Sequence, residues 1–267
     1  MKKRVISVIV FLSITAALLL IGRPTRILFA LICGCICCHD MTTALKHLDH
    51  NVTPWFGYIF VAITCLVTFM GWEISPMPIA LVLIFAALSM SVFFEKFKPT
   101  DMLLSLSLLV YPGLLIAMIT EVLAQDAPMW YVAILTGAAS AALCDTFALF
   151  GGMAFGKHKL APRISPNKTI EGAVCGLLSA IVTGVILYFI FKNTGIEVPV
   201  WGYMVISAVS STLGQVGDLI ASSFKRQAGI KDYSNLIPGH GGMMDRLDSH
   251  LFAIPAAYYM ILLFTIV

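Results

Sequence analysis

Nine apolar segments, each close to the length of a membrane span, follow one another along the chain. A helix that crosses a bilayer needs about 20 mostly apolar residues. Hydrophobic residues make up 59% of the 267 residues and charged residues only 12%. No soluble fold can bury this much apolar surface, because even a domain of about 300 residues leaves about a quarter of its chain surface exposed. The expected spans are 5–21, 27–44, 55–72, 77–94, 102–120, 129–154, 172–191, 201–223 and 249–267.

This pattern predicts an all-α, polytopic integral membrane protein of about nine transmembrane helices. We expect about five helices in an N-terminal region, 1–120, and about four in a C-terminal catalytic region, 121–267. Two connections, 155–171 and 224–248, are longer than a simple helix connector needs to be. Pro112 is expected to kink the fifth span, which membrane helices tolerate.

The basic residues predict how the chain is oriented. With a cytoplasmic N-terminus, fourteen of the 17 Lys and Arg residues fall on the cytoplasmic side, and only Arg23, Arg26 and Lys192 on the other. Basic residues favour cytoplasmic loops. We therefore expect a multi-pass protein of the cell membrane whose C-terminus lies on the opposite side and whose two long loops face the cytoplasm. The net charge of +3 is small and unevenly placed, and this uneven placement indicates membrane orientation, not nucleic-acid binding.

The first apolar segment follows Lys2, Lys3 and Arg4, so a signal peptide is an alternative to a first span. No convincing small-residue cleavage site follows Leu20, and we expect an uncleaved anchor.

Acidic residues at the ends of the last two spans suggest a metal site. Asp218 lies inside the eighth span, where an ionisable side chain marks function by default. Ser222 is four residues further on and shares a helix face with Asp218. Asp245 and Asp248 would share a face if Asp245 opens the ninth helix. Carboxylates from two helices suit Mg²⁺, which usually takes one or two of them together with substrate phosphates and water. We predict Asp218 and Asp245 as metal ligands, with one or two ions left open.

Cations and glycines surround these acids. Lys225 and Arg226 are predicted to act in catalysis with Asp218 and Asp245, since cations neutralise the charge of a polyphosphate. Glycines let backbone approach an anion closely, and the helix that follows offers its N-terminus to a phosphate. The substrate-binding candidates are Ser222, Lys231, Asp232, His240, Gly241, Gly242, Arg246, Asp248, Ser165 and Lys168.

Two of the polar residues, His240 and Asp145, have more than one interpretation. In one interpretation His240 donates a hydrogen bond to a substrate phosphate, and in the other it is a structural hydrogen-bonding residue. Asp145, deep in the sixth span, is either functional or pairs two helices. Asp40 lies near an interface and is expected to be structural.

The run Ser222–Asp248 resembles the signature of the phosphatidate cytidylyltransferases, also called CDP-diacylglycerol synthases, without departure over its 27 residues. The stretch Gly156–Gly172 resembles a second block of that family. The similarity in motifs begins at Asp145, and the N-terminal spans match only in length and hydropathy. Family members tend to carry a Tyr where this chain has Leu149, which leaves the role of Asp145 open.

The resemblance implies a Mg²⁺-dependent reaction in which CTP and phosphatidate give CDP-diacylglycerol and pyrophosphate among membrane lipids. An isoprenoid-lipid cytidylyltransferase or a polyprenol kinase is an alternative, and a transporter is a further one. Transporters usually place polar residues at the midplane and often contain inverted repeats, whereas this polar cluster lies at one interface. Homodimers are common among such enzymes, and the sequence leaves monomer and homodimer open.

Overall fold

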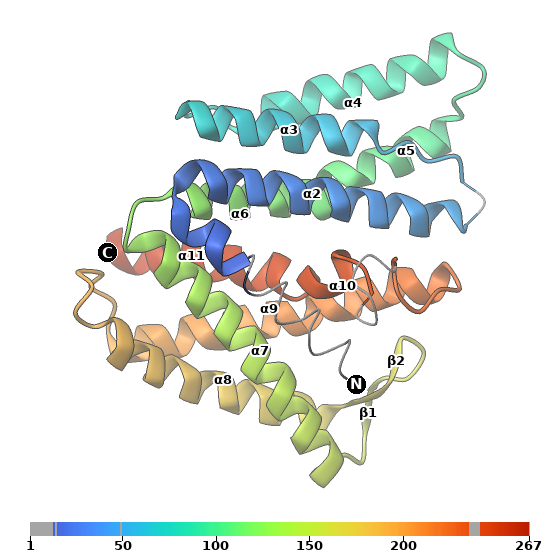
Figure 1. The fold of residues 1–267 in the computed structure, drawn as a ribbon. Helices are drawn as coiled ribbons and strands as arrows, with labels where there is room; N and C mark the ends of the chain where they lie inside the picture. Colours follow the sequence, from blue (N-terminus) through green and yellow to red (C-terminus); the bar gives the residue numbers. More distant parts are fainter. Residues whose placement is uncertain (1–12, 14, 49, 235–240, 267) are drawn as a thin grey trace. The chain divides into compact units, whose positions relative to one another are not determined.

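The computed structural model describes residues 13, 15–48, 50–234 and 241–266, so most of the first expected span lies outside the described residues. The described part consists of helices and one two-stranded sheet (Figure 1). Six of its helices are long and apolar enough to cross a membrane, and α3 and α11 are apolar but shorter. The chain is an all-α integral membrane protein apart from that small sheet.

The chain forms two compact units, and the first comprises Met1–Ala124 with Phe224–Arg246. Its helices are α2 (Arg23–Lys46), α3 (Trp55–Met70), α4 (Pro76–Phe93), α5 (Pro99–Leu108), the π-helical turn η1 (Leu109–Leu114) and α6 (Leu115–Ala124). Helix α2 packs against α3 and α6, and α4 packs against α3 and α5 (Figure 1). A Cβ at Gly34 of α2 would lie 2.7 Å from Val61 and 2.8 Å from Ile116. A glycine therefore lets α2 approach both neighbours, as small residues do between membrane helices.

The expected kink at Pro112 is present. The span predicted at 102–120 is divided into α5, η1 and α6, and Tyr111 has non-helical backbone angles of φ −131° and ψ 106°. Proline has no amide hydrogen and its ring collides with the preceding turn, so the regular hydrogen-bond pattern cannot pass through it.

The second unit comprises Gln125–Ser223 with Leu247–Val267. Its elements are α7 (Met129–Phe155), β1 (Lys159–Ala161), β2 (Ser165–Thr169), α8 (Ile170–Phe191) and α11 (His250–Ile266). Helix α7 packs along α8 and against α11 (Figure 1). Two further helices, α9 (Val200–Gln227) and α10 (Met244–Leu247), begin in one unit and end in the other.

The long connection at 155–171 is more regular than the sequence suggested. Strands β1 and β2 pair in antiparallel fashion and form a hairpin between α7 and α8. Thr169 caps the start of α8, because its hydroxyl accepts the amide of Gly172 at 3.1 Å. The Glu171 carboxylate accepts the amides of Lys157 and His158 at 3.1 and 3.2 Å. The start of α8 is thus hydrogen-bonded to the segment between the end of α7 and the hairpin.

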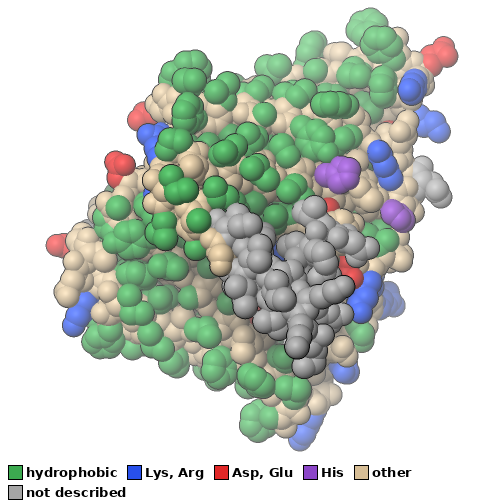
Figure 2. All heavy atoms as spheres, in the orientation of Figure 1, with side chains coloured by type: hydrophobic (Ala, Val, Ile, Leu, Met, Phe, Trp, Pro, Cys, Tyr) green, Lys and Arg blue, Asp and Glu red, His purple; other side chains and the backbone are tan. Residues whose placement is uncertain are grey.

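Large apolar side chains remain exposed along the helices. Phe85 is 75% exposed, Phe93 79% and Phe189 60%. Figure 2 shows apolar side chains spread over the face drawn. Exposure on this scale indicates contact with lipid, because soluble monomers rarely leave such large apolar patches open to water.

Candidate active site

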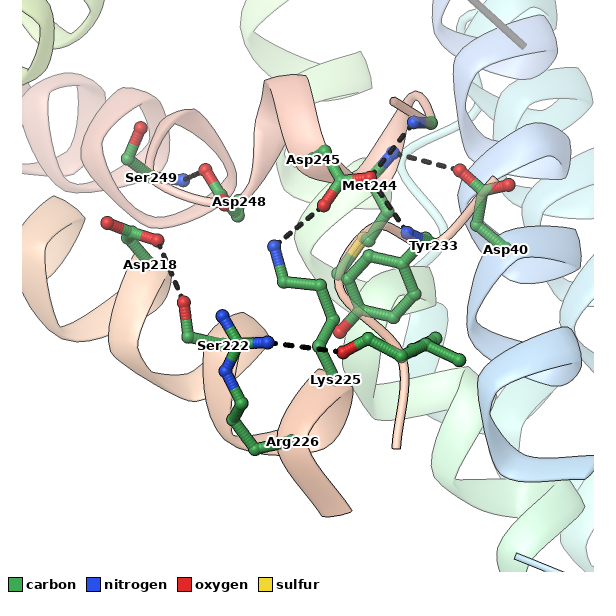
Figure 3. A network of polar contacts seen from close by, with 12 residues as sticks. Asp40, Asp218, Ser222, Lys225, Arg226, Tyr233, Met244, Asp245, Asp248 and Ser249 are labelled. Carbon is green, nitrogen blue, oxygen red and sulfur yellow. Dashed lines mark hydrogen bonds and ion pairs between the residues drawn. The ribbon is translucent and has the colours of Figure 1, made fainter. Parts of the chain in front are cut away.

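The carboxylate of Asp245 is the centre of a polar cluster in the first unit. Its Oδ1 accepts a hydrogen bond from Lys225 Nζ at 2.7 Å, and the pair is an ion pair in which the two side chains are only 4% and 11% exposed. Its Oδ2 accepts the backbone amides of Tyr233 and Gly242, each at 2.9 Å. Figure 3 shows these contacts converging on one side chain. Asp245 therefore joins the end of α9 to both parts of the loop.

The glycines of the loop lie against carboxylates. Gly241 has a φ of +83°, which L side chains rarely adopt, and a Cβ there would lie 2.8 Å from Asp245 Oδ2. The sequence suggested that these glycines let the backbone approach an anion. In the structure Gly241 approaches the protein's own Asp245 carboxylate, and the expectation of a phosphate at this position stays a prediction.

Asp40 of α2 holds the next part of the same turn. This residue is 1% exposed, and its carboxylate Oδ2 accepts the amide of Met244 at 3.1 Å (Figure 3). A Cβ on Gly242 would collide with the same oxygen. The structural role expected for Asp40 is confirmed in detail, because this carboxylate anchors the residue that directly precedes Asp245.

A second charged cluster lies in the second unit, around Asp218 of α9. Asp218 Oδ2 forms an ion pair with Nζ of Lys168, at the end of β2, and its Oδ1 accepts the Ser222 hydroxyl at 3.3 Å. Both charged side chains are half-buried, with 25% and 29% exposed. The hairpin thus brings a lysine of the first long connection to the membrane aspartate.

A cavity of about 620 Å³ opens beside this ion pair. Asp145, Lys168 and Asp218 line it together with apolar residues of α7. Two carboxylates and a lysine in one cavity can bind a phosphorylated ligand and a hard cation. This placement favours the functional interpretation of Asp145 over simple helix pairing, since this carboxylate faces the same space as Asp218.

The structure also describes most of the other predicted site residues. Arg226 donates to the carbonyl of Ile230 at 3.4 Å, and Asp248 accepts the amide of Ser249 at 2.7 Å. Lys231, Asp232 and Arg246 are exposed, and Ser165 begins β2. His240 lies outside the described residues.

Some residues of the two clusters were not predicted. Gln215, Lys159 and Asn167 also line the cavity of Asp218. Gln215 lies three residues before Asp218 on α9, and this helical spacing could have drawn attention to it. The Asp40 contact with the loop carries no such signal, because the two residues are 204 positions apart.

Comparison with known proteins adds to this geometry. The model of the cytidylyltransferase family matches residues 2–264. The phosphatidate cytidylyltransferase of Staphylococcus haemolyticus is 34% identical over 259 residues, which are 96% of each chain. The enzyme of the same name from Haemophilus influenzae is 44% identical over 130 residues, 48% of this chain and 43% of the relative. That of Staphylococcus aureus is 48% identical over 114 residues, 42% of each chain.

Six described helices that can span a membrane, one of which carries the ion-paired Asp218, together with this similarity, define a nucleotidyltransferase embedded in a membrane. The chain belongs to the cytidylyltransferase family, whose model covers nearly its whole length.

Proposed function

We propose that this protein is a phosphatidate cytidylyltransferase, which converts CTP and phosphatidate to CDP-diacylglycerol and pyrophosphate. The observation that carries the proposal is the similarity to an enzyme of that name over 96% of both chains. The two lysine–aspartate pairs support it, because the reaction brings two phosphate-bearing anions together at a membrane surface. An isoprenoid-lipid cytidylyltransferase or a polyprenol kinase is the alternative that experiment has to separate.

This reaction depends more on neutralisation of phosphate charge than on a general base. An oxygen of the phosphatidate phosphate forms a bond to the α-phosphorus of CTP, and the bond from that phosphorus to the oxygen bridging the β-phosphate breaks. The attacking phosphate is already anionic at neutral pH, because the second pKa of a phosphomonoester is about 6. Repulsion between the two anions is therefore the main obstacle, and positioned cations lower it.

The basic residues of both clusters fit this task. Lys225 is held beside Asp245, and Lys168 beside Asp218, so each lysine has a fixed position from which it can contact phosphate oxygens. We assign Arg226, Lys231 and Arg246 to the phosphates as well, with Asp232 and Asp248 orienting these cations. Ser165, Ser222, His240, Gly241 and Gly242 complete the proposed substrate contacts.

We assign Mg²⁺ to Asp218 and Asp245. The donors fit, since carboxylate oxygens and the Ser222 hydroxyl beside Asp218 are the hard ligands that Mg²⁺ prefers. Within the described residues no three His, Cys, Asp or Glu side chains converge. A site of few protein ligands suits Mg²⁺, which completes its coordination with substrate phosphates and water. When bound, the ion would neutralise charge on the phosphates of CTP during transfer of the cytidylyl group.

We further propose nine spans, a cytoplasmic N-terminus and a cell-membrane location with both long connections facing the cytoplasm. The excess of basic residues in those connections supports this orientation. CTP would reach the site from the cytoplasm, and phosphatidate from the adjoining leaflet.

The proposal is tested with purified protein in mixed micelles and CTP labelled at the α-phosphate. We expect pyrophosphate release and a labelled lipid product that depend on both phosphatidate and Mg²⁺. A panel of acceptors, with an isoprenoid-lipid phosphate and a polyprenol as competitors, distinguishes the family alternatives. Label transfer to an isoprenoid acceptor but not to phosphatidate would refute the proposal.

A further inference from the structure

A second cavity, of about 610 Å³, lies in the first unit along helices α2 and α3. Its apolar wall includes Cys35 and Ile36 from α2 and Ala62 from α3. Its polar wall includes His39 and Tyr58, whose Nδ1 and hydroxyl are 3.2 Å apart. None of these residues belongs to the catalytic assignments above.

Polarity changes along the cavity in the same direction on both helices. On α2 the polar His39 follows Cys35 by four residues, and on α3 the polar Tyr58 precedes Ala62 by four. Four residues are one turn, or about 6 Å along a helix. Both polar side chains therefore lie about a turn nearer the Lys46 end of α2 and the Trp55 end of α3. A phospholipid has the same gradient, with esters and phosphate near the interface and acyl chains deeper.

The polar end of this cavity adjoins the turn that carries Met244 and Asp245. Asp40 lines the cavity, and its carboxylate accepts the amide of Met244. The next residue is Asp245, which is paired with Lys225. A lipid in the cavity would thus have its headgroup end beside the Lys225–Asp245 cluster and its apolar part between α2 and α3.

From this geometry we infer that the α2–α3 cavity binds the phosphatidate substrate, holding its glycerol esters and the first carbons of an acyl chain. His39 and Tyr58 supply hydrogen-bond donors at the level of the ester groups, and Ile36 and Ala62 contact the chain. The inference rests on the proposed function. It assigns lipid recognition to the N-terminal helices, which lie outside the two motif blocks at Gly156–Gly172 and Ser222–Asp248.

The first test fills the cavity by Ala62→Trp. The matched control is Ile63→Trp, which adds the same ring one position along α3, at a side chain that is 37% exposed and does not line the cavity. We expect Ala62→Trp to raise the KM for phosphatidate about tenfold, a loss of about 1.4 kcal/mol in binding. The KM for CTP should stay unchanged, and Ile63→Trp should resemble the wild type in both constants.

The second test uses the unaltered protein and needs no turnover. Cys35 lines the cavity and is half-buried, so its reaction with N-ethylmaleimide reports access to this space. Phosphatidate in the micelles should slow labelling of Cys35 severalfold, whereas CTP or phosphatidylcholine should not. Cys175 of α8, also half-buried, is the control thiol, and its labelling rate should not respond to phosphatidate.

Each outcome has a distinct meaning. The inference would be overturned if Ala62→Trp and Ile63→Trp had equal KM values for phosphatidate. It would also be overturned if phosphatidate did not change the labelling rate of Cys35. Equal protection by phosphatidylcholine would identify the cavity as a site for bulk membrane lipid and would also overturn it. Failure of the wild-type protein to transfer label to phosphatidate would instead refute the proposed function, so the two failures are distinguishable.

Discussion

The two lysine–aspartate pairs have the same chemistry but differ in how deeply their side chains are buried. The side chains of Lys225 and Asp245 are 11% and 4% exposed, against 29% and 25% for Lys168 and Asp218. Breaking a buried ion pair leaves an uncompensated charge and costs more than breaking a solvated one. Asp245 also accepts two loop amides. We therefore expect Asp245 to contribute to both stability and catalysis, and Asp218 mainly to catalysis.

Asp218→Asn and Asp245→Asn should each reduce turnover to less than about a tenth of wild type while the protein remains in the membrane. Asp245→Asn should also lower the free energy of unfolding by about 3 kcal/mol, whereas Asp218→Asn should change it by less than about 1 kcal/mol. Label transfer from CTP and thermal unfolding in detergent measure the two effects. Asp126→Asn, at an exposed acid before α7, is the control. Turnover above a tenth in either site variant would remove that residue from the metal assignment.

A single methyl group at Gly242 should disturb the turn that carries Asp245. The new Cβ would collide with Asp40 and lie 2.7 Å from Ser234 Oγ. We expect Gly242→Ala to cost about 1–3 kcal/mol of stability, as overpacking does, and to lower turnover. Gly214→Ala is the control, because its Cβ would meet no atom closer than 3.4 Å. Wild-type stability and turnover in Gly242→Ala would show that the turn is looser than the structure describes.

At the scale of elements, the β1–β2 hairpin connects α7 to α8 and brings Lys168 to Asp218. Thr169 follows Lys168 directly and caps α8. Because the cap fixes where the strand ends and the helix begins, it also fixes the backbone that carries Lys168. The hairpin therefore positions Lys168, which we propose as a substrate-binding residue, beside Asp218.

Thr169→Ala should remove the cap and destabilise the protein by about 1 kcal/mol. Turnover should fall as well, since Lys168 loses its fixed position, and Thr169→Ser should restore both because serine keeps the hydroxyl. Thr146→Ala is the control, as the Thr146 hydroxyl donates to a carbonyl within its own helix, that of Ala142 at 2.8 Å. Thermal unfolding and label transfer are measured for all three variants. A Thr169→Ser variant as impaired as Thr169→Ala would exclude the cap as the cause.

The sequence predicted the elements well and their long-range contacts poorly. Apolar length located the helices, because lipid requires each span to satisfy its own backbone. Proline chemistry located the break at Pro112. The hairpin was missed, since three- and five-residue strands carry little periodic signal. The Asp40 contact was missed because no local rule relates residues of different helices.

At the scale of the whole molecule, the distribution of basic residues predicts which connections face the cytoplasm. Reporter fusions test this. A fluorescent protein fused after Lys98 or Arg163 should fluoresce in the cytoplasm, and a phosphatase that is active only outside should be active after Asp126 or Gly195. The inverse pattern, or activity of both reporters at one junction, would contradict the nine-span arrangement with a cytoplasmic N-terminus.

The hydrogen bond from the Met244 amide to Asp40 also has a consequence for biosynthesis. Its partners are 204 residues apart, so α2 leaves the ribosome long before the turn that its carboxylate will hold. During that interval a nascent chain contains the lipid-facing helices but lacks the Lys225–Asp245 pair. Unfinished chains therefore lack a pair that we assign to the catalytic site, and the proposed site is complete only when nearly all of the protein has been translated.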